Sequence, residues 1–132
     1  MVVDRLRPQL RPQLRPELRP QLSDEEVDRL FRALADATRR DVVRRVLVAE
    51  ESVSDLARHY PMSITAVQKH VAVLEAAGLV SKRKQGREQR VAGQVEAIRR
   101  AQGLLDAYEQ VWRHRLDGMK AVLEDQSQKG TS

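Results

Sequence analysis

The sequence of 132 residues contains no cysteine. Disulfide bonds, thiolate metal sites and thiol-based redox sensing are therefore excluded together. It also lacks any apolar run near the roughly 18 residues that a membrane span needs. Prolines and arginines stand near the N-terminus where a signal peptide would have an apolar core. We therefore expect a soluble cytoplasmic protein without membrane contact, with room for one domain.

The motifs of the common enzyme classes are missing as well. There is no cysteine nucleophile, no glycine-rich phosphate loop, no histidine close to a candidate serine, and no pair of carboxylates in an apolar setting. We therefore predict that the protein is not an enzyme and has no cofactor.

Positive charge is concentrated in two segments. The formal net charge is +5, and residues 1–22 carry five arginines against Asp4 and Glu17. Residues 79–90 carry five cations against Glu88 alone, namely Lys82, Arg83, Lys84, Arg87 and Arg90. Because the rest of the chain is balanced or slightly acidic, this distribution favours a polyanionic partner.

The first 22 residues are a low-complexity repeat. Leu-Arg-Pro-Gln begins at Leu6, Leu10 and Leu18, and Leu-Arg-Pro-Glu begins at Leu14. A proline at every fourth position excludes a helix, and this spacing differs from the three residues of a PxxP ligand. We predict a disordered arm. The alternative is an arginine arm that adds sequence-independent phosphate contacts.

From Ser23 onward the pattern becomes helical. Ser23 and Glu26 form a capping box, which predicts a first helix ending near Ala35. Asp36 is expected to cap a second helix, and a short third helix is expected over residues 54–60, before a proline. The apolar positions of the first two helices are Val27, Leu30, Phe31 and Leu34, then Val42, Val43, Val46 and Leu47.

The segment from residue 61 to 91 predicts a helix followed by a basic hairpin. Ser63 can cap the helix, Gly78 can end it, and Gln85-Gly86 can form the turn of the hairpin. Val67, Val71 and Leu74 share one face and are expected to pack inward, whereas Ser63, Thr65, Gln68 and Lys69 lie on the opposite face. A helix of this kind fills the DNA major groove while a basic hairpin contacts adjacent phosphates, as in a winged helix-turn-helix.

A long last helix is expected over residues 94–124. Its apolar positions are Ile98, Ala101, Leu105, Tyr108, Trp112, Met119 and Val122, mostly three or four apart, which approaches a heptad seam. Gly103 and Gly118 weaken the helix locally, so we expect fraying after Gly118 and a flexible tail over 125–132.

Five segments of the chain match a known pattern in their order and spacing, namely residues 31–40, 54–57, 65–71, 74–80 and 86–87. Together they resemble the ArsR-type winged helix repressors, and the match extends from about Leu30 to Val91. The resemblance implies a homodimer joined through its first and last helices. It also implies double-stranded DNA as partner, with two helices in successive major grooves of a palindromic operator, and repression of a nearby promoter, often the protein's own.

The expected fold is mostly α-helical with a small β-hairpin wing, a winged helix-turn-helix over 23–93 and a dimerisation helix over 94–124. The expected DNA-contacting residues are Ser63, Thr65, Gln68, Lys69, His70, Lys82, Arg83, Lys84, Arg87 and Arg90. The expected dimer contacts are Val27, Leu30, Phe31, Leu34, Leu105, Tyr108, Trp112 and Met119.

The chain differs from the family pattern at several positions. Ala37 stands where proline is common, Val71 where leucine is common, and Gln68 where serine or arginine is common. Glutamine can pair bidentately with adenine, so the preferred DNA site is expected to differ. His70 matches a frequent family histidine, and we expect it to pack the helix or bond one phosphate.

The metal ligands of the family's sensors are largely missing. Ser52-Val53-Ser54-Asp55-Leu56 stands where thiolate sensors have Cys-Val-Cys-Asp-Leu, and serine binds soft metals poorly. His114 and Asp117 are three apart on the last helix, but Ala101 and Gly103 stand where zinc sensors have an Asp-x-His. Two ligands are too few for a tight tetrahedral site, so we predict no metal site.

Two other functional classes remain as alternatives. A ligand- or metal-gated sensor would need a pocket that the sequence does not show, and it would release DNA when its ligand binds. A dimeric protein-interaction module would dock its basic wing on an acidic protein, and it would show no preference for any DNA sequence.

Overall fold

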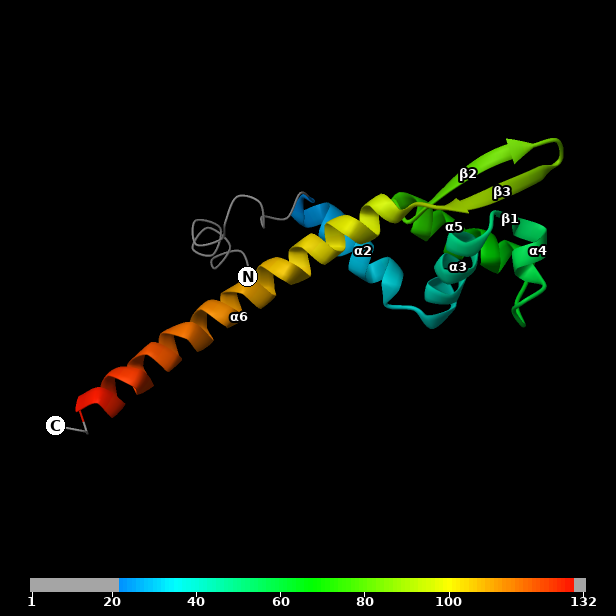
Figure 1. Ribbon diagram of the computed structural model, residues 1–132. Helices are drawn as coiled ribbons and strands as arrows, with labels where there is room; N and C mark the ends of the chain where they lie inside the picture. Colours follow the sequence, from blue (N-terminus) through cyan, green and yellow to red (C-terminus); the bar gives the residue numbers. More distant parts are fainter. Residues whose placement is uncertain (1–21, 130–132) are drawn as a thin grey trace. The chain divides into compact units, whose positions relative to one another are not determined.

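The computed structural model describes residues 22–129, so the predicted arm, apart from Leu22, and residues 130–132 lie outside the described part. The order of elements is α2 (Asp24–Leu34), α3 (Ala37–Val48), β1 (Glu51–Ser52), α4 (Val53–Ala57), α5 (Ile64–Ala76), β2 (Val80–Gln85), β3 (Glu88–Gly93) and α6 (Val95–Lys129) (Figure 1). Residues 22–101 form one compact unit, and α6 from Gln102 onward belongs to a second. The predicted fold class, mostly helical with a small wing, is confirmed.

Local capping determines where the first helices start. The hydroxyl of Ser23 accepts from the N–H of Glu26 at 3.2 Å, and the Glu26 carboxylate accepts from the Ser23 N–H at 3.2 Å. Asp36 accepts from the N–H of Arg39 at 3.0 Å at the start of α3. These bonds satisfy amides that have no partner inside a helix, and both predicted helix starts are confirmed.

The short helix α4 differs from its prediction at both ends. The hydroxyl of Ser52 accepts from the N–H of Asp55 at 3.0 Å, so the helix begins at Val53 and not at residue 54. The α-helix ends at Ala57, and the next three amides bond to carbonyls three residues back, as in a 3₁₀ turn. The expected range of 54–60 was therefore wrong.

The sheet has three antiparallel strands in the order β1-β3-β2. The wing hairpin pairs Val80 with Gly93 and Gln85 with Glu88, and Gly86 takes a φ of 62° in its turn. Strand β1 was not predicted, because two residues are too few to show the alternation of a strand. This strand attaches the base of the wing to the segment between α3 and α4.

One core lies within residues 22–101. It is formed by Leu30, Ala33, Val42, Val43, Val46, Val53, Leu56, Val67, Val71, Leu74, Leu79, Val80, Val91, Ala97 and Ala101. Leu47 was expected to be an apolar position of the second helix, but it is 43% exposed. It lies instead against Gly93, where a Cβ atom would come within 2.7 Å of the Leu47 side chain. A glycine at the end of β3 therefore permits close approach of this strand to α3.

Helix α6 is longer than predicted. It runs from Val95 to Lys129, so residues 125–129 are helical and do not form a flexible tail. Gly103 and Gly118 do not interrupt it, although each glycine costs up to about 1 kcal/mol relative to alanine. Ala97 and Ala101, near its start, belong to the core of the first unit. No helix in the described range is long and apolar enough to cross a bilayer.

Candidate nucleic-acid interface

Helix α5 presents the polar face that the sequence predicted. Val67, Val71 and Leu74 are fully buried, while Ser63, Thr65, Gln68 and Lys69 are exposed. The hydroxyl of Ser63 accepts from the N–H of Ala66 at 3.1 Å and so begins the helix. Because the buried face fixes the rotation of α5, Thr65, Gln68 and Lys69 are directed away from the core.

The connection between α4 and α5 is held to α3 by a polar cluster around Asp41. Its carboxylate accepts from the Tyr60 hydroxyl at 2.6 Å, from Arg45 at 2.8 Å and from Arg44 at 2.7 Å. The Arg45 guanidinium also lies 6.0 Å from the centre of the Tyr60 ring. Since Tyr60 follows α4, these bonds fix the turn that precedes α5. The contact with Tyr60 was not predicted from the sequence, although an Asp followed at three and four residues by Arg predicts helical ion pairs.

The cluster shifts the pKa of both its acidic groups. Hydrogen bonds from Tyr60, Arg44 and Arg45 lower the pKa of the Asp41 carboxyl well below its usual value. Burial and the neighbouring Asp41 carboxylate raise the pKa of Tyr60 to about 12. Asp41 is therefore charged and Tyr60 protonated at neutral pH.

We expect Asp41→Asn to lower the free energy of unfolding by about 1–2 kcal/mol at pH 7, because the ion pairs with Arg44 and Arg45 are replaced by hydrogen bonds to a neutral acceptor. Since folding lowers the pKa of Asp41, its stabilising effect is complete above the unfolded pKa, near 4, declines below that pH, and is fully lost only as the pH falls through the lowered folded pKa. Urea unfolding should show a smaller difference in the free energy of unfolding between wild type and variant at pH 3 than at pH 7. Tyr60→Phe removes one donor and should lower the free energy of unfolding by less. If the effect of Asp41→Asn did not depend on pH, the charge of Asp41 would not have this stabilising role.

His70 connects α5 to the corner between α2 and α3. Its Nδ1 lies 3.4 Å from Nη1 of Arg39. Arginine can only donate, so Nδ1 is the acceptor and Nε2 carries the proton. Arg39 also donates to the carbonyls of Ala33 at 2.8 Å and Arg32 at 2.9 Å, which lie at the end of α2. The Nδ1 atom of His70 is thus bonded within the protein. This partnership with Arg39 was not predicted from the sequence.

The five cations of the wing are not equivalent, although sequence analysis treated them alike. Arg83 and Arg90 both donate to the carboxylate of Glu50, at 2.6 and 3.2 Å, and these bonds lower the pKa of that carboxyl. Lys82 lies 3.5 Å from Glu75 of α5. Within the described range Lys84 and Arg87 have no ion pair, and both are exposed. Glu50 and Glu75 lie outside residues 79–90, so a count over that segment could not include them.

The expected dimer residues fall into three groups, which are buried, half-buried and exposed. Leu30 is 1% exposed and belongs to the core of its own chain, which corrects its assignment as an interface residue. A helical stripe alone does not distinguish a residue buried within the chain from one buried between chains. Val27 and Leu34 are half-buried, whereas Phe31, Leu105, Tyr108, Trp112 and Met119 are exposed.

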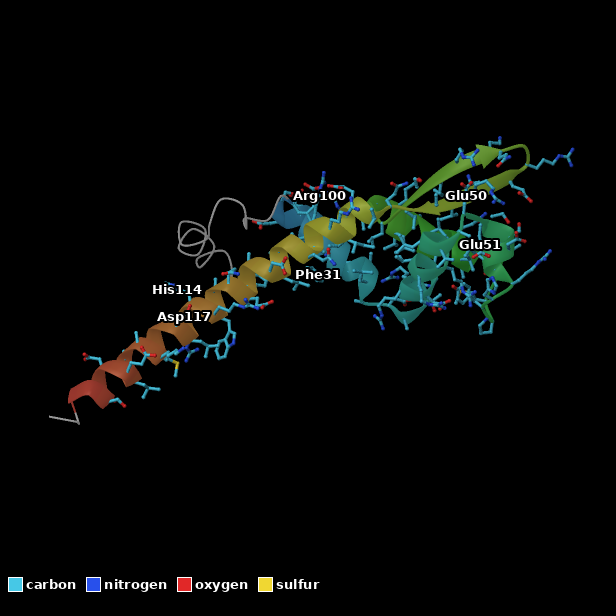
Figure 2. The ribbon with its side chains drawn as sticks, in the orientation of Figure 1. Phe31, Glu50, Glu51, Arg100, His114 and Asp117 are labelled. Carbon is cyan, nitrogen blue, oxygen red and sulfur yellow. The ribbon has the colours of Figure 1, made fainter. Side chains whose placement is uncertain are left out.

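The histidines do not gather with other ligand side chains. Figure 2 shows His114 and Asp117 on α6, where both are exposed. His59 lies 3.3 Å from Glu51, a single carboxylate. Among the described residues there is no group of three or more histidine, aspartate or glutamate side chains able to hold a metal ion.

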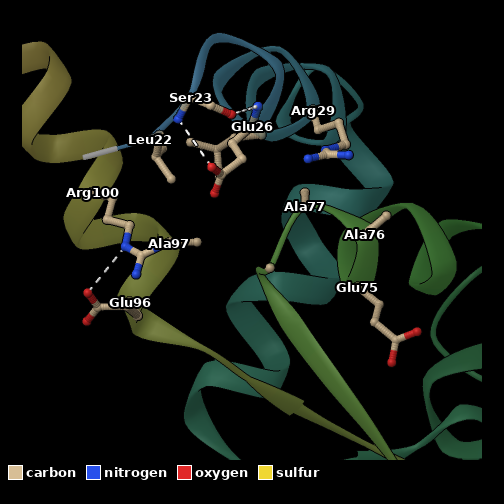
Figure 3. A pocket seen from close by; sticks show the side chains of 12 residues that line it. Leu22, Ser23, Glu26, Arg29, Glu75, Ala76, Ala77, Glu96, Ala97 and Arg100 are labelled. Carbon is tan, nitrogen blue, oxygen red and sulfur yellow. Dashed lines mark hydrogen bonds and ion pairs between the residues drawn. The ribbon is translucent and has the colours of Figure 1, made fainter. Parts of the chain in front are cut away.

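A pocket of about 330 Å³ lies where the start of α2, the end of α5 and the start of α6 meet (Figure 3). Its lining includes three carboxylates and two guanidinium groups, from Glu26, Glu75, Glu96, Arg29 and Arg100. Each carboxylate has a partner in the chain. Glu26 accepts from the Ser23 N–H, Glu75 pairs with Lys82, and Glu96 pairs with Arg100. With its charges of both signs, the lining favours neither an anion nor a cation. This pocket could not be predicted from the sequence, because its walls come from three distant segments.

Comparisons with known proteins agree on one family. The sequence pattern of the "Bacterial regulatory protein, arsR family" matches residues 36–82, from the start of α3 into β2. The HTH-type transcriptional regulator Rv2034 of Mycobacterium tuberculosis is 46% identical over 59 residues. That match spans 45% of this chain and 55% of the mycobacterial protein.

Solved structures extend the similarity to most of the chain. The ArsR-like transcriptional regulator from Rhodococcus sp. RHA1 has a TM-score of 0.70 and 33% identity, covering 76% of this chain and 93% of that one. The homodimeric winged helix-turn-helix DNA-binding domain Mb0332 from Mycobacterium bovis has a TM-score of 0.53 and 25% identity, covering 70% and 88%. On this evidence, the chain belongs to the ArsR family of bacterial regulatory proteins.

Proposed function

We propose that the protein is a homodimeric, sequence-specific DNA-binding repressor, which binds a palindromic operator, including one at its own promoter. The observation that carries this proposal is the exposed polar face of α5 beside a wing with two exposed cations, Lys84 and Arg87, which have no ion pair among residues 22–129. Thr65 and Gln68 contact base edges in the major groove. Lys69, Lys84 and Arg87 contact phosphates, which adds affinity but carries no sequence information.

Two observations support a homodimer. The related domain Mb0332 is homodimeric, and α6 exposes Leu105, Tyr108, Trp112 and Met119 at steps of three, four and seven residues. Apolar side chains at this spacing lie along one side of a helix. A symmetric dimer presents two copies of α5, and its operator is then a palindrome with half-sites about one helical turn apart.

Control by metals is not part of this proposal. In thiolate sensors, cysteines occupy the positions of Ser52 and Ser54. Here the hydroxyl of Ser52 is buried and accepts from the Asp55 N–H at 3.0 Å, so it serves as the cap of α4. A hydroxyl that is already engaged in a helix cap is a poor ligand for a soft metal.

Selection of bound duplexes from a random pool tests the proposal, performed without metal and with zinc, nickel or cobalt. We expect one palindromic consensus that is the same in every sample. Binding without sequence preference would indicate a protein-interaction module instead. A tenfold or larger change in operator affinity with a metal, lost in His114→Ala, would indicate a gated sensor.

A further inference from the structure

Glu50 lies between two arginines that face each other across the wing. Arg83 of β2 and Arg90 of β3 are partners in the antiparallel register, so their side chains lie on the same face of the hairpin. Both guanidinium groups donate to one carboxylate oxygen of Glu50. Glu50 precedes β1 and is labelled in Figure 2. Two like charges directly opposite each other repel, and the carboxylate between them relieves that repulsion.

The two arginines are held to different extents. Arg90 makes a second bond, to the backbone carbonyl of Glu50 at 3.3 Å, lies 3.7 Å from Glu88, and has a side chain that is 26% exposed. Within the described part of the chain Arg83 has a single ion-pair partner, Glu50 at 2.6 Å, and its side chain is 61% exposed. Arg90 is therefore fixed at the base of the wing, whereas Arg83 could reach a phosphate if Glu50 released it.

We propose that Glu50 withholds Arg83 from the DNA backbone, so that the wing meets phosphates through Lys84 and Arg87. This inference rests on the proposed DNA-binding function and concerns the sequence-independent part of the binding affinity. The carboxylate occupies Arg83 as a phosphate would, and its own charge repels nearby phosphates within the Debye length of about 10 Å. Because phosphate contacts act on every sequence alike, withholding one contact weakens binding to non-operator DNA as well as to the operator.

Glu50→Gln tests this role, because the amide keeps the shape and an acceptor oxygen but loses the charge. We expect the variant to bind both the operator and a scrambled duplex about two- to fivefold more tightly at low salt. The slope of log affinity against log salt should steepen by about 0.9, the value for one added phosphate contact on duplex DNA. Adding Arg83→Ala to this variant should return the slope to that of wild type.

Glu88→Gln is the matched control, since it removes the same charge from the wing but lies against Arg90 and not Arg83. It should leave the slope unchanged. Lower affinity or an unchanged slope in Glu50→Gln would overturn the proposal and make Glu50 a residue that orients the wing. If Glu50→Gln failed to fold, Arg83→Ala in the wild-type chain would still test the proposal. A salt slope flattened by about 0.9 would show that Arg83 already contacts phosphate, and this would overturn the proposal. Failure of the wild type to bind any duplex would instead refute the proposed function.

Discussion

Trp112→Ala should shift the protein from dimer to monomer at micromolar concentration and reduce its operator affinity accordingly. Trp112 is 52% exposed in the single chain, on the same side of α6 as Leu105, Tyr108 and Met119. Burying a large apolar side chain contributes roughly 1.5–3 kcal/mol, and association costs an estimated 4–15 kcal/mol. Loss of one central aromatic residue typically costs about 2 kcal/mol or more of association free energy. This cost is therefore enough to shift the protein from dimer to monomer.

Sedimentation or light scattering across a concentration series measures this effect directly. His114→Ala is the matched control, because two residues along a helix place its side chain on the side opposite Trp112. The control should remain dimeric. The Arg115 guanidinium lies 5.7 Å from the centre of the Trp112 ring, so Arg115→Ala should have a small effect of its own. A wild-type protein that is monomeric at micromolar concentration would remove the basis for a palindromic operator.

Features that depend on neighbouring residues could be predicted from the sequence. The caps by Ser23, Asp36 and Ser63 each involve a side chain and an amide three residues later, so a short sequence window contains both partners. The exposed face of α5 followed from the period of its buried positions, and the left-handed glycines Gly78 and Gly86 marked the ends of α5 and β2. These local signals were sufficient for the fold class.

Features that join distant segments could not be predicted in the same way. Glu50 meets Arg83 and Arg90 only because β1 pairs with β3, and β1 itself is too short for a sequence signal. The bond between Tyr60 and Asp41 likewise spans nineteen residues along the chain. The sequence showed how many charges the wing carries, but only the fold shows which of them are already neutralised.

Gln68→Ala should lose about 1–3 kcal/mol of operator binding while its affinity for a scrambled duplex stays nearly unchanged. Gln68 is exposed on α5, between Thr65 and Lys69, and a glutamine amide can bond both N6 and N7 of adenine. Arg87→Ala should behave differently, because Arg87 stands at the exposed tip of the wing with no ion pair among the described residues. It should weaken binding to both duplexes and flatten the log–log salt dependence by about 0.9.

Titration of both duplexes at several salt concentrations separates these two kinds of contact. Gln89→Ala is the matched control for Gln68→Ala, because it removes the same exposed amide from β3 of the wing. A loss confined to the operator in Gln68→Ala, and absent from Gln89→Ala, places the sequence readout on α5. Equal losses of Gln68→Ala on operator and scrambled DNA would mean that this side chain contacts the backbone. In that case α5 would not lie in the major groove with its polar face against the bases, and the proposed docking would be wrong.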